Sequence, residues 1–336
     1  MTNSDTIPVR PEEAFNKSRL EAYLKGKLEG SVNSLVVRQF GGGKANLTYL
    51  LDYGEREYVL RRPPLGPVAP TAHDMAREYK VLSVLHENFP YAPQALHFCA
   101  DEEIIGAPFF IMDRKVGIVI RTTLPDNFAK MANGPELISA QLINILAEFH
   151  QVNYSSLGLD DLGKPKGFLQ RQVKGWKNRW DKAKHEDLPA VEKIYSWLNE
   201  NIPETKNYSI IHNDYKLDNV MYNTNDPGKL IAVFDWDMCT LGDSLCDLGS
   251  LLSYWCTTSD PVFFQKAASM PIDDRFYSRA QLVQQYAEMT GFDVSNIRFY
   301  HVLGLYRLIG IAAQIYIRFL RGQTQDKRFA IFGNMI

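Results

Sequence analysis

The stretch Ile210-Ile211-His212-Asn213-Asp214-Tyr215-Lys216-Leu217-Asp218-Asn219-Val220 decides the fold of this chain. An apolar run enters a polar loop that carries an acid, Asp214, and an amide five residues later, Asn219. A second apolar run, residues 230–234, leads to another acid, Asp235. This order of strand, polar loop, strand and acid is typical of a site that takes a proton from a hydroxyl group and holds magnesium against a nucleoside triphosphate.

The polar side chains of this stretch have predicted roles in phosphoryl transfer. A carboxylate can accept the proton of an attacking hydroxyl group, so Asp214 is the predicted catalytic base. Magnesium prefers hard oxygen ligands, so Asn219 and Asp235 are the predicted metal ligands. Lys216 is predicted to steady the phosphoryl group during transfer. The alternative is that these residues serve only in turns and caps, where Asp and Asn are common, but their ordered strand context disfavours it.

His212 has two interpretations. It either fixes the loop by hydrogen bonding or acts as a ligand in a His-x-Asp metal site. No second histidine lies nearby at ligand spacing, which favours the first interpretation.

Length and composition indicate the broad class of protein. The chain has 336 residues, of which 45% are hydrophobic and 23% charged, and its net charge is -2. These values are ordinary for a globular protein of two lobes or domains, and they provide no basic field for nucleic acid or an anionic membrane. Apolar tracts such as residues 308–317 are too short to span a bilayer, and residues 1–8 lack a signal-peptide pattern. Because the four cysteines form no CxxC, we expect reduced thiols and a cytoplasmic protein. The sequence does not determine the oligomeric state.

The first third of the chain predicts a helix followed by a strand hairpin with a glycine loop. Residues 11–30 have helical spacing, and the strand-like runs 35–40 and 47–52 flank the sequence Gly41-Gly42-Gly43-Lys44-Ala45-Asn46. Such a loop lets the backbone lie close over phosphates, and no GK[ST] opens a helix as in a Walker loop. The alternative is an ordinary hairpin turn. The predicted nucleotide-binding residues here are Gly41, Gly42, Gly43 and Asn46.

A cation and an acid follow on the next strand and helix. Residues 58–64 predict a third strand with Arg61, whose guanidinium can grip phosphate oxygens bidentately. Arg62 points to the opposite face of this strand and is predicted to lie at the surface. Residues 72–85 predict a helix that carries Glu78. Solvated charges are the alternative for both Arg61 and Glu78.

The pattern His-x-Asp-x-Lys-x-x-x-Asn followed by Asp-Trp-Asp resembles the catalytic and metal loops of the aminoglycoside phosphotransferase family, a small-molecule branch of the protein-kinase-like fold. The resemblance implies a bilobal α+β protein that uses ATP and Mg²⁺. Residues 1–113 would form a nucleotide-binding N-lobe with a small antiparallel sheet, and residues 114–336 a mostly helical C-lobe with the catalytic loop, metal site and acceptor pocket. Arg61 would pair with the phosphates, Glu78 would orient it by an ion pair, and the backbone at Met112 would hold the adenine edge.

The chain departs from the family pattern at several positions. Asn213 replaces the usual middle residue of the loop and is predicted to change little. Asp237 stands where family members commonly have glutamate, so its role in metal binding is open. The segment Gly242-Asp243-x-x-x-Asp247-Leu248 resembles the closing motif of the family; we predict a turn or cap role for Asp243 and a buried loop anchor for Asp247. No Ala-Pro-Glu activation segment follows, which favours a small hydroxylated acceptor over a protein substrate.

Two helical stretches of the second half contain further candidate residues. Residues 135–151 predict a long helix whose His150 is packed or capping rather than a ligand. Residues 167–180 predict a helix in which Arg171 or Trp176 could face a substrate, with surface and core roles as the alternative. This second helix and the Leu-Arg-Arg-Pro-Pro sequence resemble kinase-like domains found beside acyl-CoA dehydrogenases, which implies a hydroxyacyl or similar acceptor.

The predicted function is ATP- and Mg²⁺-dependent O-phosphorylation of a small hydroxylated molecule, with no nucleic-acid or membrane partner. Two alternatives remain. One is a catalytically silent, nucleotide-binding pseudokinase that acts as an interaction module, and the other is a magnesium-dependent phosphohydrolase. Turnover measured with and without an alcohol acceptor separates them.

Overall fold

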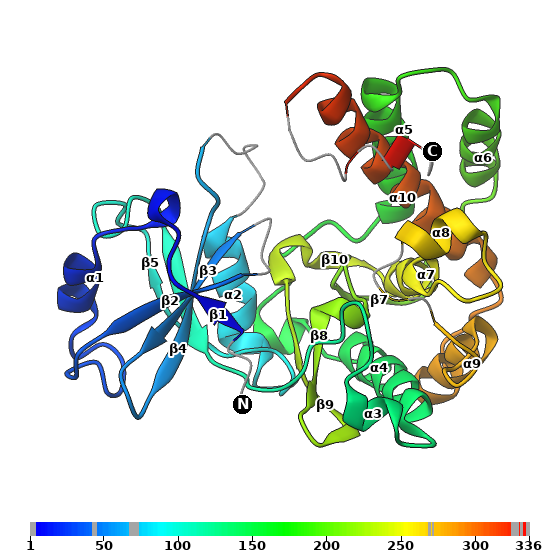
Figure 1. The fold of residues 1–336 in the computed structure, drawn as a ribbon. Helices are drawn as coiled ribbons and strands as arrows, with labels where there is room; N and C mark the ends of the chain where they lie inside the picture. Colours follow the sequence, from blue (N-terminus) through cyan, green and yellow to red (C-terminus); the bar gives the residue numbers. More distant parts are fainter. Residues whose placement is uncertain are drawn as a thin grey trace. The chain divides into compact units, whose positions relative to one another are not determined.

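The computed structural model describes residues 5–41, 46–66, 74–267, 270, 272–323, 329 and 332–333. The fold is α+β, as predicted (Figure 1). The chain divides into two compact units: the first is Met1–Val116 with Ala232–Asp237, and the second is Gly117–Ile231 with Met238–Ile336. The lobe boundary after residue 113 stays a prediction, and the compact division adds the short segment Ala232–Asp237 to the first unit.

The first unit is built on a six-stranded sheet with the strand order β1-β2-β3-β4-β6-β5. Each neighbouring pair of strands is antiparallel, as the sequence predicts. The strands are β1 (Thr6–Ile7), β2 (Val36–Phe40), β3 (Leu47–Asp52), β4 (Glu57–Arg62), β5 (Ala95–Cys99) and β6 (Phe109–Asp113). The helices of this unit are α1 (Lys17–Leu24) and α2 (Met75–Leu85) (Figure 1).

Side-chain alternation along β4 sends neighbouring residues to opposite faces of this sheet. Leu60 belongs to the buried core that Leu20 and Leu24 of α1 also join. Arg61 points to the other face, where its partner in the register with β6 is Phe110. The ring of Phe110 contacts Tyr79 of α2, with 6.5 Å between ring centroids. Alternation on β4 therefore brings Arg61 to the face that α2 covers.

Arg62 is buried, so the prediction that it lies at the surface is wrong. The residue is 4% exposed, and its Nη1 donates a hydrogen bond to the Ile105 carbonyl oxygen at 2.7 Å. Desolvation lowers the pKa of the Arg62 guanidinium. Alternation assigned the correct face, but the elements that cover that face come from distant parts of the chain and leave no mark on the local pattern.

The N-terminal helix is shorter than the predicted range 11–30. A 3-10 turn occupies Pro11–Glu13, and α1 covers only Lys17–Leu24. The side chain of Asn16 accepts a hydrogen bond from the Arg19 backbone N–H at 3.0 Å and caps the start of the helix. The chain leaves the helix before Gly26, whose φ is 78°. Capping and a left-handed glycine therefore override the longer apolar periodicity.

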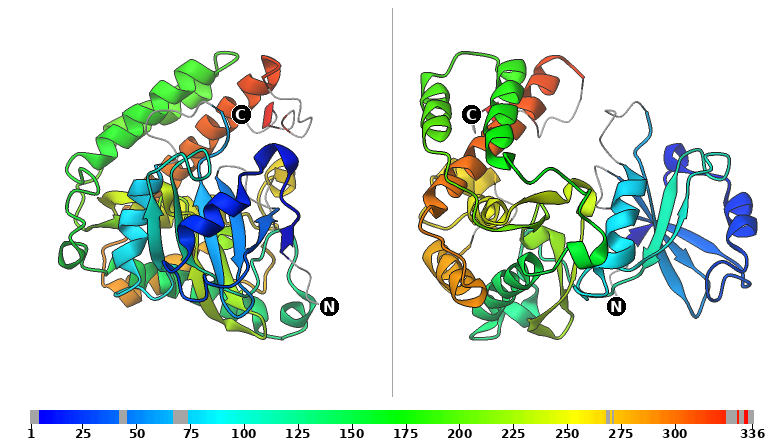
Figure 2. Two further views of the ribbon diagram at one scale, coloured as in Figure 1. Left: turned by 90° about the vertical axis from the view of Figure 1, so that its left-hand side faces the viewer. Right: turned by 180° about the vertical axis from the view of Figure 1, so that it is seen from behind.

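The second unit is mostly helical, as predicted. Its helices are α3 (Asp126–Ala129), α4 (Gly134–His150), α5 (Phe168–Ala183), α6 (Pro189–Glu200), α7 (Leu245–Tyr254), α8 (Val262–Ala267), α9 (Arg279–Thr290) and α10 (Ile297–Leu320). Two strand pairs accompany them: β7 (Tyr208–Ile211) with β10 (Thr240–Asp243), and β8 (Val220–Asn223) with β9 (Asp226–Val233). Helices α5 and α6 lie side by side, and both contact α10 (Figure 2).

Helices α7 and α10 approach each other closely at two glycines. A Cβ atom at Gly249 would lie 2.4 Å from the backbone of Tyr300, and one at Gly304 would lie 2.3 Å from Ser253 Oγ. Any larger residue would push the helices apart, because no real Cβ contact is this short. The two glycines therefore fix α7, and with it the segment that precedes the helix.

Helix α10 is long and apolar enough, by length and composition, to cross a membrane. The predicted tract of residues 308–317 is only the middle part of α10, so the prediction that such tracts are too short does not cover the whole helix. A core helix meets the same test. In the described part of the chain α10 contacts α5, α6 and α7 and buries apolar residues against them, among them Phe299, Tyr306 and Ala313.

Candidate active site

The predicted catalytic loop lies between two short strands of the second unit. Strand β7 leads into it, and β8 begins at Val220, directly after a 3-10 turn at Leu217–Asn219. Asn213 has a φ of 65°, in the left-handed region that asparagine tolerates better than most residues. Its Nδ2 donates to the Met238 carbonyl oxygen at 2.8 Å. The sharp bend at Asn213 thus turns the chain from the strand into the loop.

Asp214 is held by two side chains of its own loop. Its Oδ2 accepts one hydrogen bond from Lys216 Nζ and one from Asn219 Nδ2, each at 2.8 Å. Asn219 Nδ2 also donates to the Asp214 carbonyl oxygen at 2.8 Å. The side chains of Asp214 and Lys216 are 16% and 20% exposed, so the pair is partly open to solvent. The structure therefore brings together three of the residues that the sequence predicts.

The charge of Lys216 is stabilised by its surroundings. Burial, the largest influence, would lower the pKa of the ammonium group, but the Asp214 carboxylate raises it above its ordinary value. The ammonium group also lies 4.8 Å from the centroid of the Tyr254 ring, within range of a cation–π interaction. Lys216 is thus a fixed positive charge beside Asp214.

Asp247 anchors the backbone of the loop. Its carboxylate accepts hydrogen bonds from the backbone N–H groups of His212 at 2.6 Å and Asn213 at 2.7 Å. Asp247 is fully buried, which would raise its pKa, but the hydrogen bond and charge of His150 and the His212 backbone hold the pKa below its ordinary value. The predicted role of Asp247 as a buried loop anchor is confirmed.

His150 extends this anchor to helix α9. Its Nε2 lies 3.2 Å from Asp247 Oδ2 and its Nδ1 lies 2.7 Å from Tyr286 Oη. His150 is 3% exposed, so the prediction of a packed histidine is confirmed. Asp243 accepts a hydrogen bond from the Leu245 backbone N–H at 3.1 Å at the start of α7, the turn or cap role that was predicted.

His212 hydrogen-bonds within its own loop. It is fully buried, and its Nδ1 accepts a hydrogen bond from the Asp214 backbone N–H at 3.2 Å. A ring nitrogen that accepts a loop hydrogen bond agrees with the loop-fixing interpretation.

A second cluster of predicted residues lies in the first unit. Arg61 Nε donates to Glu78 Oε2 at 3.0 Å, which is the ion pair that the sequence predicts, and Arg61 Nη2 donates to Asp235 Oδ1 at 2.6 Å. The side chains of Arg61 and Glu78 are 12% and 2% exposed, and that of Asp235 is 34% exposed. Asp235 follows β9 with a φ of 70°, an uncommon conformation for a residue with a side chain. Glu78 of α2 and Asp235 in the turn after β9 thus both bind the guanidinium of Arg61 on β4.

The charges of this cluster act on one another. Burial would lower the pKa of Arg61, but Glu78 and Asp235 raise it above its ordinary value. Burial raises the pKa of Glu78 to about 7, because Arg61 only partly offsets the loss of water and Asp235 and Asp237 repel its negative charge. Asp235 makes the shorter contact with Arg61 and therefore competes with Glu78 for the same cation.

Comparison with known proteins identifies the chain. The model of the APH phosphotransferase enzyme family matches residues 36–282. The chain belongs to this family. Its kinase-like relatives in fold confirm the predicted bilobal protein-kinase-like class.

Three known proteins are similar to this chain. Acyl-CoA dehydrogenase family member 11 of Pongo abelii is 33% identical over 344 residues, which cover 99% of this chain but only 43% of that protein. The crystal structure of a candidate aminoglycoside phosphotransferase from Ralstonia eutropha JMP134 is 29% identical, has a TM-score of 0.80, and covers 96% of this chain and 94% of its own. Aminoglycoside phosphotransferase APH(4)-Ia, solved with AMP-PNP and hygromycin B, shares the fold at 16% identity and a TM-score of 0.57, with 94% and 96% coverage.

The remaining residues that the sequence predicts to bind the nucleotide are described only in part. Gly42 and Gly43 lie outside the described residues. Gly41 follows β2, and Asn46, which is 3% exposed, directly precedes β3. Met112 lies on β6 opposite Val59 of β4 and Ala95 of β5, so strands flank its backbone on both sides. The nucleotide-binding roles of these residues stay predictions.

The side-chain oxygen atoms of Asn219 and Asp235 are of the kind that magnesium prefers as ligands. Asn219 uses its Nδ2 to bind Asp214, which leaves the carbonyl oxygen Oδ1 as the atom able to bind a cation. Asp235 provides a carboxylate, also a hard oxygen ligand. Among the residues that the structure describes, no three or more His, Cys, Asp or Glu side chains gather closely enough to hold a metal ion. The metal-binding roles of Asn219 and Asp235 stay predictions.

The two residues singled out on α5 have structural surroundings. Trp176 is 7% exposed and packs against Gly310 of α10, where a Cβ atom would lie 2.9 Å from the indole ring. Arg171 is exposed and donates to the carbonyl oxygens of Lys164 and Lys166. Trp176 is therefore a core residue and Arg171 is a surface residue, as the alternative interpretation of this helix predicts.

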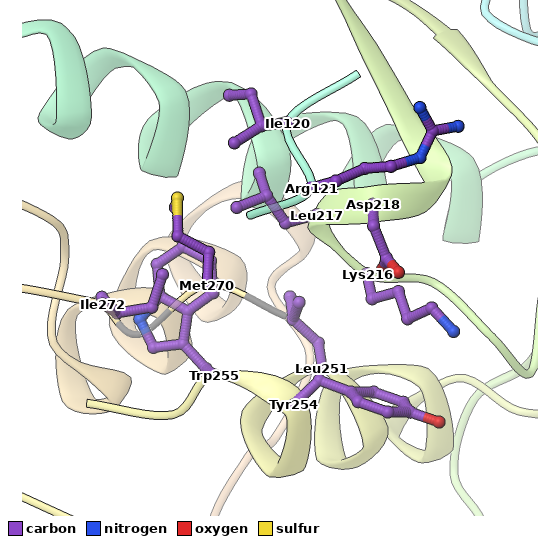
Figure 3. A pocket seen from close by; sticks show the side chains of 10 residues that line it. All are labelled: Ile120, Arg121, Lys216, Leu217, Asp218, Leu251, Tyr254, Trp255, Met270 and Ile272. Carbon is purple, nitrogen blue, oxygen red and sulfur yellow. The ribbon is translucent and has the colours of Figure 1, made fainter. Parts of the chain in front are cut away.

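Sequence reasoning missed residues that reach the catalytic loop from far along the chain. Tyr286 supports His150, and Tyr254 lies against Lys216. Lys216 and Asp218 also line a pocket of about 150 Å³ together with residues of α7 and of the segment before α9 (Figure 3). No local pattern in the sequence signals these contacts; only the family's closing motif, which begins α7, indicates that α7 lies near the loop.

Proposed function

We propose that this protein is an ATP- and magnesium-dependent phosphotransferase that phosphorylates a hydroxyl group of a small molecule, with Asp214 as the base. The observation that carries the proposal is the pair of hydrogen bonds from Lys216 and Asn219 to one oxygen of Asp214. Membership of the phosphotransferase family supports the reaction class. A relative in fold solved with AMP-PNP and hygromycin B supports a nucleotide donor and a small hydroxylated acceptor.

The residues of the second unit position the base. Lys216 and Asn219 occupy Oδ2 of Asp214 and leave Oδ1 as the oxygen to accept the proton of the acceptor hydroxyl. Asp247 holds the loop backbone through two hydrogen bonds, so the carboxylate is oriented before the acceptor arrives. Phosphoryl transfer requires alignment and charge stabilisation more than covalent chemistry, and this arrangement supplies the alignment.

The predicted nucleotide and metal residues complete the proposal. Asn219 and Asp235 would hold magnesium, which neutralises phosphate charge when it is bound. Arg61, oriented by Glu78, would bind phosphate oxygens. The loop Gly41–Gly43, Asn46 and the backbone near Met112 would contact the rest of the nucleotide. We also propose a cytoplasmic location, since the four cysteines are free thiols.

The substitution Asp214→Asn tests the proposal. We expect turnover to fall by ~10²–10⁴-fold while the Kd for magnesium ATP stays within about twofold, because only the proton acceptor is lost. Acceptor-dependent ADP release gives the turnover, and calorimetry gives the Kd. Asp187→Asn, at a carboxylate whose side chain is 88% exposed, is the matched control and is expected to change neither.

Other outcomes distinguish the alternatives. Unchanged turnover in Asp214→Asn would remove Asp214 as the base. Binding of magnesium ATP by the wild type without transfer to any alcohol would favour the pseudokinase that acts as an interaction module. Release of inorganic phosphate at the same rate with and without an acceptor would identify a phosphohydrolase.

A further inference from the structure

The pocket beside the catalytic loop has a polar side and an apolar side. Its ten lining residues all belong to the second unit, and its volume is about 150 Å³. Figure 3 shows the side chains of Arg121, Asp218, Lys216 and Tyr254 gathered on one side, whereas those of Met270 and Ile272 lie on the other. A ligand that fills this pocket must therefore carry its polar group at one end.

The polar side of the pocket adjoins the proposed base. Lys216 lines the pocket and donates to Asp214 Oδ2 at 2.8 Å, so one side chain separates the pocket from the base. Burial raises the pKa of the Tyr254 phenol, so this residue is a neutral hydroxyl group at ordinary pH. The polar side thus presents charges of both signs and a hydroxyl group to a ligand.

The apolar side of the pocket is built from buried hydrocarbon. Leu251 lies on α7, Trp255 directly follows that helix, and Ile272 comes from the segment before α9. Their exposed fractions are 0%, 2% and 3%. The indole Nε1 of Trp255 donates to the Tyr277 carbonyl oxygen at 2.8 Å, so the polar atom of the ring is already satisfied. Only apolar ring surface remains for a ligand.

Size and charge restrict the ligand. Apolar cavities of about 150 Å³ take up molecules of the size of benzene, which has six carbons. The lining provides two cations, Arg121 and Lys216, but one carboxylate, Asp218. A polycationic aminoglycoside would need several carboxylates and far more room.

We propose that this pocket holds the hydrocarbon body of the acceptor, and that the acceptor is a small alcohol that carries no positive charge and has a body of about six carbons. The inference rests on the proposed function. The acceptor oxygen forms a bond to the γ-phosphorus of ATP, the bond from that phosphorus to the β–γ bridging oxygen breaks, ADP leaves, and the hydroxyl proton passes to Asp214. Trp255, Leu251 and Ile272 set the length of the acceptor.

A series of straight-chain alcohols from ethanol to 1-decanol tests the length dependence. Each buried methylene is expected to raise kcat/KM about fourfold, until the chain exceeds about six carbons and the increase stops. Hygromycin B is expected to give no acceptor-dependent ADP release. Ile272→Phe fills the apolar side, so it should lower kcat/KM for 1-hexanol at least tenfold more than it lowers kcat/KM for ethanol.

Structural damage would lower the rates for all alcohols alike, so the change in length preference is the informative readout. Val262→Phe, at a position that is 65% exposed, adds the same ring outside the pocket and should preserve the preference for 1-hexanol. Equal losses for ethanol and 1-hexanol in Ile272→Phe would count against the pocket as the acceptor site.

Fluorescence gives a measure of binding that is independent of turnover. The probe is 6-bromo-1-hexanol, whose bromine quenches a tryptophan in contact with it. Wild-type protein is expected to show saturable quenching that Trp255→Phe removes, although the other four of its five tryptophans remain. Quenching that persists in Trp255→Phe would overturn the pocket assignment.

The failures of the two proposals are distinguishable. Transfer to hygromycin B but to none of the alcohols would leave the phosphotransferase function in place and overturn the acceptor class. Transfer to no acceptor at all, in protein that still binds magnesium ATP, would overturn the proposed function and the acceptor role of the pocket together.

Discussion

The two charged clusters of this protein pair carboxylates with cations in opposite ways. In the second unit, Asp214 is one carboxylate with two donors, and its side chain is 16% exposed. In the first unit, Arg61 is one cation with two carboxylates, and the Glu78 side chain is 2% exposed. The first arrangement orients a carboxylate and keeps it accessible, whereas the second holds a guanidinium in place at the cost of crowding negative charge.

The comparison shows that burial decides what a pair of a carboxylate and a cation contributes to the protein. A partly open ion pair contributes little to stability, and its value lies in the orientation of the reacting group. A buried pair is sensitive to the loss of either partner, because the remaining charge is left without water or a counter-ion. Stability measurements should therefore respond to the Arg61 cluster, and turnover should respond to the Asp214 cluster.

Removal of the Arg61 cation is expected to have the largest effect on stability. Arg61→Met should lower the free energy of unfolding by about 3–5 kcal/mol, because two carboxylates lose their shared partner. Urea denaturation measures the change. Arg56→Met, in the exposed pair of Arg56 with Glu29, is the matched control in the same unit and should change stability little. Equal losses in both variants would contradict the distinction between buried and exposed pairs.

The raised pKa of Glu78 predicts a pH dependence of intermediate size. Since the folded-state pKa is about 7 and the ordinary value is 4.5, the unfolded chain loses this proton at lower pH than the folded one. The contribution of Glu78 to stability is therefore complete below pH 4.5 and is lost as the pH rises to about 7. The loss should be about 2–3 kcal/mol across this window.

Glu78→Gln isolates this contribution. The variant should gain stability relative to the wild type as the pH rises from 4.5 to 7, because glutamine has no proton to lose. Urea denaturation at several pH values measures the difference, and Glu87→Gln, at an exposed residue after α2, should show no such trend. A constant difference between Glu78→Gln and wild type would show that Glu78 keeps one protonation state throughout.

Weakening the loop anchor is expected to have the smallest effect, and it should appear in turnover. Asp247→Asn retains the shape but weakens the acceptor of the His212 and Asn213 N–H groups. We expect kcat to fall about tenfold with little change in KM for ATP. The substitution disturbs the orientation of the base, whereas the contacts of the nucleotide are unchanged.

Asp243→Asn is the matched control for the anchor. Asp243 lies four residues earlier in the same motif, and its carboxylate accepts hydrogen bonds from Tyr300 Oη at 2.8 Å and from the Leu245 backbone N–H at 3.1 Å. It should lower stability without a specific loss of kcat. A proportionate loss of kcat in both variants would make Asp247 a residue of general stability only.

Local patterns predicted much of the fold. Alternation gave the strands of the antiparallel sheet, and helical spacing located α2 and α4 to within a few residues. The catalytic loop was also predictable, because Asp214, Lys216 and Asn219 lie within six residues and meet through local hydrogen bonds. Such contacts depend on the chain conformation over one loop, which spacing in the sequence constrains.

Contacts between distant segments were decided by the tertiary structure alone. The buried Arg62 donates to the carbonyl oxygen of Ile105, 43 positions away, and the support of His150 depends on Tyr286, 136 positions away. The pocket combines the loop with α7 and Ile272, so neither its size nor its apolar side has a local signature. Sequence spacing determined which chemical groups share a loop or a strand face, whereas burial, and hence the charge state of Glu78 and the room for an acceptor, arose only when separate elements packed together.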